Sequence, residues 1–147
     1  MPSKMDRSKV VVILEDDQYI RGLLAQILQD KGYYVVPVET GLRALQVLQQ
    51  VRARLLVMDL MLPDMPGNQV LQALRADEKT KDVPVMVLSS HLHMLQDGSG
   101  YEADQVIGKP FDVSDVVDEV ERLVGRPFTE EPSINFGGML VKGFALG

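Results

Sequence analysis

Five polar residues that follow apolar segments of the sequence could together carry out phosphoryl transfer. Asp16 and Asp17 follow the first segment, Asp59 the third, Ser89 the fourth and Lys109 the fifth. Carboxylates brought together repel one another, by about 4 kcal/mol for a pair 4 Å apart at an effective dielectric constant near 20. A divalent cation relieves this repulsion, and carboxylate oxygens suit Mg²⁺. Such an ion, with a lysine and a hydroxyl donor, stabilises a phosphoryl group that arrives on a carboxylate.

Buried strands alternate with amphipathic helices along the chain, and these elements must position the five residues. Residues 10–14 are apolar without interruption, which is typical of a parallel strand that helices cover on both faces. Further strands are predicted at 34–36, 55–58, 83–88 and 105–107. Helices are predicted over 20–28, from Leu42, from Val70, within 91–100 as a short one, and from Val113. This alternation predicts an α/β, doubly wound five-stranded parallel sheet with helices on both faces.

Individual residues predict where some of these elements begin, end or lie. Gly32 is suited to end the first helix, and Thr40 to cap the second. Pro37 cannot donate to a sheet ladder, so its strand should lie at an edge. Asp112 or Ser114 is expected to cap the last helix, which residues 125–127 (Gly-Arg-Pro) end.

The composition narrows the classes of protein to which the chain can belong. Its 147 residues suffice for one domain of ordinary size. The formal net charge of −6 disfavours direct binding to nucleic acid. No apolar run approaches the roughly 20 residues that a membrane span needs, so a cytoplasmic protein is expected. The absence of cysteine excludes disulfides and thiolate metal sites.

Four short motifs, in this order, give the sequence a specific resemblance. They are residues 15–17 (Glu-Asp-Asp), residues 59–67 (Asp-Leu-Met-Leu-Pro-Asp-Met-Pro-Gly), Ser89, and residues 109–111 (Lys-Pro-Phe). They resemble the receiver domain of two-component response regulators, including its single-domain, chemotaxis-regulator-like members. The resemblance covers about residues 9–124 and implies a flavodoxin-like sheet of strand order 2-1-3-4-5.

The segments on either side of the resemblance are expected to add little. Residues 1–8 would be an N-terminal extension. Residues 125–147 would be a C-terminal tail without an effector domain, either disordered or folded back over the domain.

The resemblance implies a metal site and a phosphoacceptor. Asp59 would accept the phosphoryl group from phosphohistidine on a histidine kinase or phosphotransfer protein. Asp17 and Asp59 would bind Mg²⁺ directly, together with the main-chain carbonyl of Met61. Asp16 would act on the ion through water.

The resemblance also implies how the phosphorylated state is held and passed on. Lys109 would pair with the phosphoryl oxygens, Ser89 would move to meet them, and the peptide bond before Pro110 would be cis. The domain would assist its own phosphorylation without being a conventional enzyme. Its further partners would be a downstream protein target and a second copy of the chain in a homodimer.

Two features depart from the family pattern and support an alternative function. Receiver domains usually carry Tyr or Phe three residues before the lysine, where this chain has Val106, and the segment from Ser89 to Lys109 is shorter than is usual in the family. The alternative is therefore an adaptor with the receiver fold that works without phosphorylation. A phosphatase of the haloacid dehalogenase type is disfavoured, because that family places its nucleophile in an Asp-x-Asp pattern after the first strand.

Overall fold

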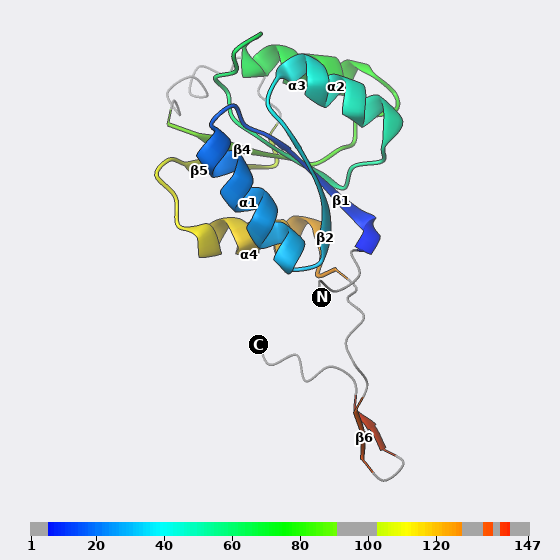
Figure 1. Cartoon of the computed structure of the whole chain (residues 1–147). Coiled ribbons are helices and arrows are strands. Elements are labelled where there is room, and N and C mark those ends of the chain that lie inside the picture. The colour runs from blue at the N-terminus through cyan, green and yellow to red at the C-terminus, as the bar shows by residue number, and fades with distance from the viewer. Residues whose placement is uncertain (1–5, 91–102, 128–133, 137–138, 142–147) are drawn as a thin grey trace.

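A computed structural model describes residues 6–90, 103–127, 134–136 and 139–141 (Figure 1). Its main feature is a five-stranded sheet of order β2-β1-β3-β4-β5, in which every neighbouring pair is parallel. The strands are β1 (Asp6–Leu14), β2 (Tyr33–Val38), β3 (Leu55–Met58), β4 (Val85–Ser89) and β5 (Gln105–Gly108). The described helices are α1 (Gln18–Asp30), α2 (Gly41–Gln50), α3 (Gly67–Ala76) and α4 (Val113–Val124). The predicted α/β class, parallel sheet and strand order are confirmed.

The described helices cover both faces of the sheet, two on each face (Figure 1). On one face α1 and α4 pack their apolar side chains, such as Leu24 and Val116, against alternate residues of the strands. On the other face α2 and α3 do the same with side chains such as Ala44 and Leu71. This double cover explains why residues 10–14 of β1 and all of β3 are apolar without alternation, since both faces of a central parallel strand are buried.

The ends of several elements lie where the sequence predicts them. Gly32, after α1, has a φ of 104°, a left-handed conformation that favours glycine. Thr40 caps α2, because its hydroxyl oxygen accepts a hydrogen bond from the Arg43 amide at 3.1 Å. Asp112, rather than Ser114, is the N-cap of α4.

The starts of β4 and β1 and the C-terminal region differ most from the sequence-based expectation. β4 begins at Val85 rather than at Val83, because the Val83 amide donates to the Thr80 carbonyl in the turn that follows α3. β1 begins earlier than predicted, at Asp6. In the C-terminal region, β6 (Ile134–Phe136) and β7 (Met139–Val141) form a separate antiparallel pair that the sequence analysis did not predict.

Some predictions concern residues that the structure does not describe. The short helix predicted within residues 91–100 lies among them. Across the described part of the chain, no helix has the length and apolar character needed to cross a bilayer.

Candidate functional site

The candidate site lies at the carboxyl ends of the central strands, where ligands bind in open parallel sheets. Asp59 directly follows β3, and its amide donates to the carbonyl of Leu14, the last residue of β1, at 3.1 Å. Lys109 directly follows β5, and its amide donates to the Ser89 carbonyl at the end of β4, at 3.0 Å. The hydrogen-bonded register of adjacent strands therefore brings these distant residues to one edge of the sheet.

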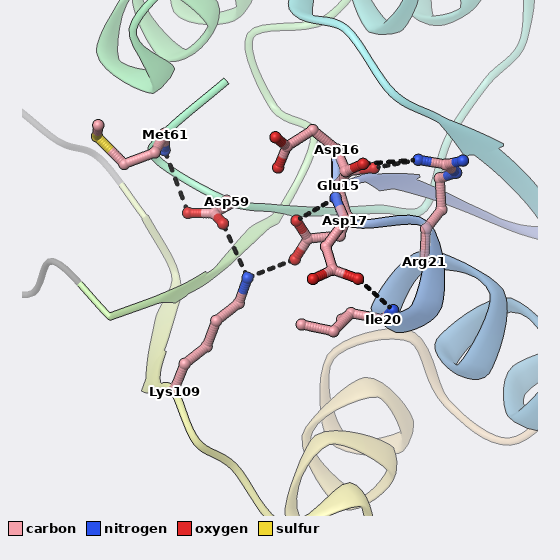
Figure 2. Close-up of polar contacts among 8 residues, drawn as sticks. All are labelled: Glu15, Asp16, Asp17, Ile20, Arg21, Asp59, Met61 and Lys109. Carbon is pink, nitrogen blue, oxygen red and sulfur yellow. Dashed lines mark hydrogen bonds and ion pairs between the residues drawn. The ribbon is translucent and has the colours of Figure 1, made fainter. Parts of the chain in front are cut away.

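The ammonium group of Lys109 lies between two carboxylates (Figure 2). Its Nζ atom is 2.8 Å from Oδ2 of Asp59 and also donates to Oε1 of Glu15. The exposed fractions of the three side chains are 16% for Lys109, 11% for Asp59 and 3% for Glu15. One cation thus serves two largely buried anions, which leaves an excess of negative charge in the site.

Burial and hydrogen bonding shift the pKa values of Glu15 and Lys109 in opposite directions. Burial raises the pKa of Glu15 above the ordinary glutamate value, although hydrogen bonds from Lys109 and the Asp17 amide oppose the shift. Burial alone would lower the pKa of Lys109, but its hydrogen bonds to Asp59 and Glu15 outweigh burial and raise it. Lys109 is therefore held in its charged form at neutral pH.

Three carboxylates are close enough to hold a cation together. Glu15, Asp16 and Asp59 each offer one oxygen, and these oxygens all lie within 4.8 Å of one another. Glu15 and Asp59 are buried and Asp16 is exposed, so the cluster opens to solvent on one side. A set of oxygen ligands with an open side fits Mg²⁺, which keeps several of its waters when bound.

The structure places Asp17 outside this cluster, contrary to the predicted ligand set. Its Oδ1 atom accepts a hydrogen bond from the Ile20 amide at 3.0 Å and so caps the N-terminus of α1. Glu15 takes the place expected for Asp17, and its Oε2 accepts from the Asp17 amide at 3.2 Å. The acidic pair beside Asp59 is thus Glu15 and Asp16, one residue earlier than predicted. The sequence contains a signal for the capping role of Asp17, because this residue stands three positions before Ile20, the first apolar residue of the helical pattern.

The loop after Asp59 is held in place by its own backbone. The Met61 amide donates to Oδ1 of Asp59 at 3.1 Å, and Met61 bridges to Pro66 across the loop. The Gly67 amide donates to the Leu60 carbonyl at 2.8 Å. A Cβ atom on Gly67 would lie 2.7 Å from Cα of Leu60, so only glycine fits there without a shift of the backbone. The role predicted for the Met61 carbonyl as a metal ligand stays a prediction.

Asp64 ties this loop to helix α2, a contact that the sequence analysis missed. Its Oδ1 accepts from the Gly41 amide and its Oδ2 from the Leu42 amide, both at 2.9 Å. These hydrogen bonds, that from Leu42 first, hold the pKa of Asp64 below the ordinary aspartate value. A carboxylate at a helix N-terminus satisfies free amides and interacts favourably with the helix dipole.

Arg21 contacts the loop that carries the acidic pair, and the sequence analysis missed this contact too. Its Nη1 atom donates to the main-chain carbonyls of Glu15 at 2.9 Å and Asp16 at 3.2 Å (Figure 2). Its Nη2 atom lies 3.7 Å from Glu39 in the loop after β2. Arg21 lies one helical turn after the Asp17 cap, a position that apolar periodicity alone does not single out.

Two further predicted positions lie on the neighbouring strands. Ser89 is fully buried at the end of β4, opposite Gly108 in the register of β5. Val106 pairs with Val87 and packs, partly buried, against the core on the side of α2 and α3. The peptide bond between Lys109 and Pro110 is cis, as the resemblance implied.

Comparisons with known proteins agree with this geometry. The model of the response regulator receiver domain family matches residues 11–121. The chain is 36% identical over 119 residues to the DNA-binding dual master transcriptional regulator RpaA of Synechocystis sp., which covers 79% of this chain and 49% of RpaA. It is 30% identical over 114 residues to sporulation initiation phosphotransferase F of Bacillus subtilis, which covers 77% of this chain and 92% of that protein.

A solved structure shares the fold over most of its length. Response regulator protein TrrA from Thermotoga maritima, solved in complex with Mg²⁺-BeF, matches with a TM-score of 0.70 at 29% identity. The match covers 78% of this chain and 98% of TrrA. The chain belongs to the response regulator receiver domain family, the phosphoacceptor switches of two-component signalling.

Proposed function

We propose that Asp59 is the phosphoacceptor of this receiver domain. The observation that carries the proposal is the position of Asp59 at the end of β3, 2.8 Å from Lys109 Nζ and beside Glu15 and Asp16. The Asp59 carboxylate is reachable from solvent on the side of Asp16. The Lys109 ammonium lies beside it and can stabilise the negative charge of an incoming phosphoryl group.

We assign the metal site to Glu15, Asp16 and Asp59, with the Met61 carbonyl as a further candidate ligand. Mg²⁺ in this position would neutralise the charge on the phosphoryl oxygens. The donor set supports the choice, since it consists of hard oxygen ligands alone. The Mg²⁺-BeF complex of the relative TrrA supports the same ion. Asp17 is left as the cap of α1.

Asp59, Lys109 and Ser89 each act on the transferred phosphoryl group. A carboxylate oxygen of Asp59 attacks the phosphorus of a phosphohistidine, the O–P bond forms and the P–N bond breaks. The electron pair returns to the imidazole of the partner, and the product here is an acyl phosphate on Asp59. Lys109 then pairs with the phosphoryl oxygens, and Ser89 supplies a hydroxyl donor from the end of β4. The chain is changed by the reaction, so it acts as a switch rather than as a turnover enzyme.

The partners that fit this role are proteins. A histidine kinase or phosphotransfer protein would donate the phosphoryl group, and a downstream protein would read the phosphorylated state, with homodimer formation as a second route of output. The net charge of −6 repels nucleic-acid phosphates, so no direct contact with nucleic acid is assigned. We place this activity in the cytoplasm.

Intact mass spectrometry after incubation with Mg²⁺ and acetyl phosphate tests the assignment. We expect the wild type to gain one phosphoryl group, and Asp59→Asn to gain none. Asp82→Asn, which alters an exposed aspartate outside the site, is the matched control and should behave as the wild type. Phosphorylation of Asp59→Asn to the wild-type extent would refute the assignment.

Val106 supports a second candidate function, the adaptor that works without phosphorylation. Valine at this position offers neither a hydroxyl nor a ring whose rotation could report the state of Asp59. If the protein is such an adaptor, wild type and Asp59→Asn will bind their partner with the same affinity, with or without acetyl phosphate. A phosphorylation-dependent affinity in the wild type alone would exclude this alternative.

A further inference from the structure

Arg21 joins three parts of the chain next to the acidic cluster. It belongs to α1, its Nη1 atom contacts the loop after β1, and its Nη2 atom faces Glu39 in the loop after β2. Its side chain is only 19% exposed, so most of it is buried. The Glu39 side chain is 68% exposed, and an ion pair of that kind contributes little.

The two carbonyls that Arg21 contacts belong to the two residues whose side chains make up the acidic pair. A backbone carbonyl lies in the same peptide plane as the next amide, so a donor that fixes two successive carbonyls fixes the orientation of both peptides. The Cα of Asp16 joins these two planes, and the Cα of Glu15 lies at the start of the first, so the peptide orientations influence the directions in which both side chains leave the backbone. The contact with Arg21 thus acts on the backbone that carries both carboxylates, in addition to the hydrogen bonds that the Glu15 carboxylate accepts from Lys109 and the Asp17 amide.

We propose that Arg21 is a positioning residue of the metal site: by holding the carbonyls of Glu15 and Asp16, it orients their carboxylates for Mg²⁺ beside Asp59. The inference rests on the proposed function, because it concerns the metal site assigned there. Groups that orient metal ligands without touching the metal typically change metal affinity 10- to 100-fold when they are removed.

Electrostatics makes the opposite prediction, which gives the proposal a clear test. Arg21 carries a positive charge near a cation site, and removal of that charge would strengthen Mg²⁺ binding if charge alone mattered. Removal of the two donors would weaken binding if orientation of the ligands matters more. The sign of the change in the Mg²⁺ dissociation constant therefore separates the two roles.

The experiment is a titration of the metal-free protein with MgCl₂, followed by the amide signals of Asp17 and Met61 in ¹⁵N NMR spectra. These amides donate to the carboxylates of Glu15 and Asp59, so they report directly on the site. Arg21→Met keeps the apolar stem and removes the donors; we expect a dissociation constant roughly tenfold higher. Arg21→Lys keeps one charged donor group with a different geometry, and its dissociation constant should lie between those of the wild type and Arg21→Met. Glu39→Gln is the matched control and should bind as the wild type.

Each outcome decides the matter. An unchanged or stronger affinity in Arg21→Met would overturn the positioning role while leaving the metal site in place. If Arg21→Met does not fold, as its metal-free spectrum and melting temperature will show, an Arg21→Lys affinity equal to that of the wild type would overturn it. A lower melting temperature with unchanged affinity would show a structural role only. Absence of Mg²⁺ binding in the wild type would overturn the proposed metal site itself.

Discussion

Lys109 Nζ lies 2.8 Å from Oδ2 of Asp59, and this ion pair joins the ends of β5 and β3 across 50 positions of sequence. The same ammonium also serves Glu15. In the absence of metal it is the group that offsets the repulsion between these two buried carboxylates. Removal of the Lys109 ammonium would leave the carboxylates of Glu15 and Asp59 without this cation. The cost in folding free energy is much larger than for the loss of a surface ion pair.

Lys109→Met should therefore destabilise the metal-free protein by roughly 3 kcal/mol, as expected when one partner of a buried ion pair is lost. The measurement is urea denaturation with and without MgCl₂, and we expect Mg²⁺ to recover part of the loss because it supplies the missing positive charge. Lys79→Met, at an exposed position of the turn after α3, should change stability little. Equal stability of the two variants would mean that Lys109 does not offset the repulsion.

Asp64→Asn should weaken the connection between α2 and the loop that carries Met61. An amide cannot accept from both the Gly41 and Leu42 amides as the carboxylate does, and loss of a capping contact costs about 1 kcal/mol. The lowered pKa of Asp64 means that its contribution is present above the ordinary aspartate pKa of 3.8 and is lost as pH falls through the folded-state pKa. The difference in melting temperature between wild type and variant should thus shrink below that pH; a constant difference would contradict the capping role.

Tyr33→Phe should destabilise the protein by about 1 kcal/mol. The Tyr33 hydroxyl donates a hydrogen bond to the Gly125 carbonyl at 2.8 Å, and the substitution leaves this carbonyl without that donor. Burial, with a smaller contribution from Glu121, raises the pKa of Tyr33 to about 12. The stability that the neutral Tyr33 hydroxyl contributes is complete below the unfolded-state tyrosine pKa of 10. It is lost as the pH rises toward the folded-state pKa of about 12. Spectrophotometric titration of tyrosinate checks the pKa, with Tyr19→Phe, 73% exposed, as the control.

Gly67→Ala and Gly22→Ala should change stability in opposite directions. At Gly67 the new Cβ would meet the backbone of Leu60 at 2.7 Å, so the loop after Asp59 must shift at a cost of about 2 kcal/mol. At Gly22, within α1, a new Cβ meets no atom within 4 Å, and alanine should stabilise the helix by about 0.5–1 kcal/mol. Thermal unfolding of both variants checks this pair. A neutral Gly67→Ala would mean that the loop accommodates the methyl group.

Much of the fold follows from local patterns that the sequence displays. The apolar runs predicted the buried strands, and Thr40 and Pro37 predicted a helix start and an edge strand, because each has a specific backbone chemistry. The strand order came from the resemblance to receiver domains and could not be worked out from periodicity. The start of β4 was misjudged because Val83 is as apolar as the strand that follows it.

The site was harder to predict in detail than the fold. Glu15, Asp16 and Asp17 have the same chemistry, and which two of them face Asp59 depends on the residue at which α1 begins. Once Asp17 is the cap, the preceding two residues turn toward the crevice. The contacts of Arg21 and Asp64 join segments whose relative positions only the folded chain defines, so neither could be recognised from local sequence.

Pro37 gives the two outer strands of the described sheet, β2 and β5, different capacities to pair with a further strand. The Val38 carbonyl accepts from Glu15 on the side of β1, so Pro37, the residue before it, presents its backbone to the outer edge, where it has no amide hydrogen. A foreign strand aligned along β2 would find its row of donors interrupted there, which is a known protection against aggregation. At the opposite edge, β5 contains no proline. Amyloid-like stacking of this sheet through β2 is thus disfavoured by a single residue.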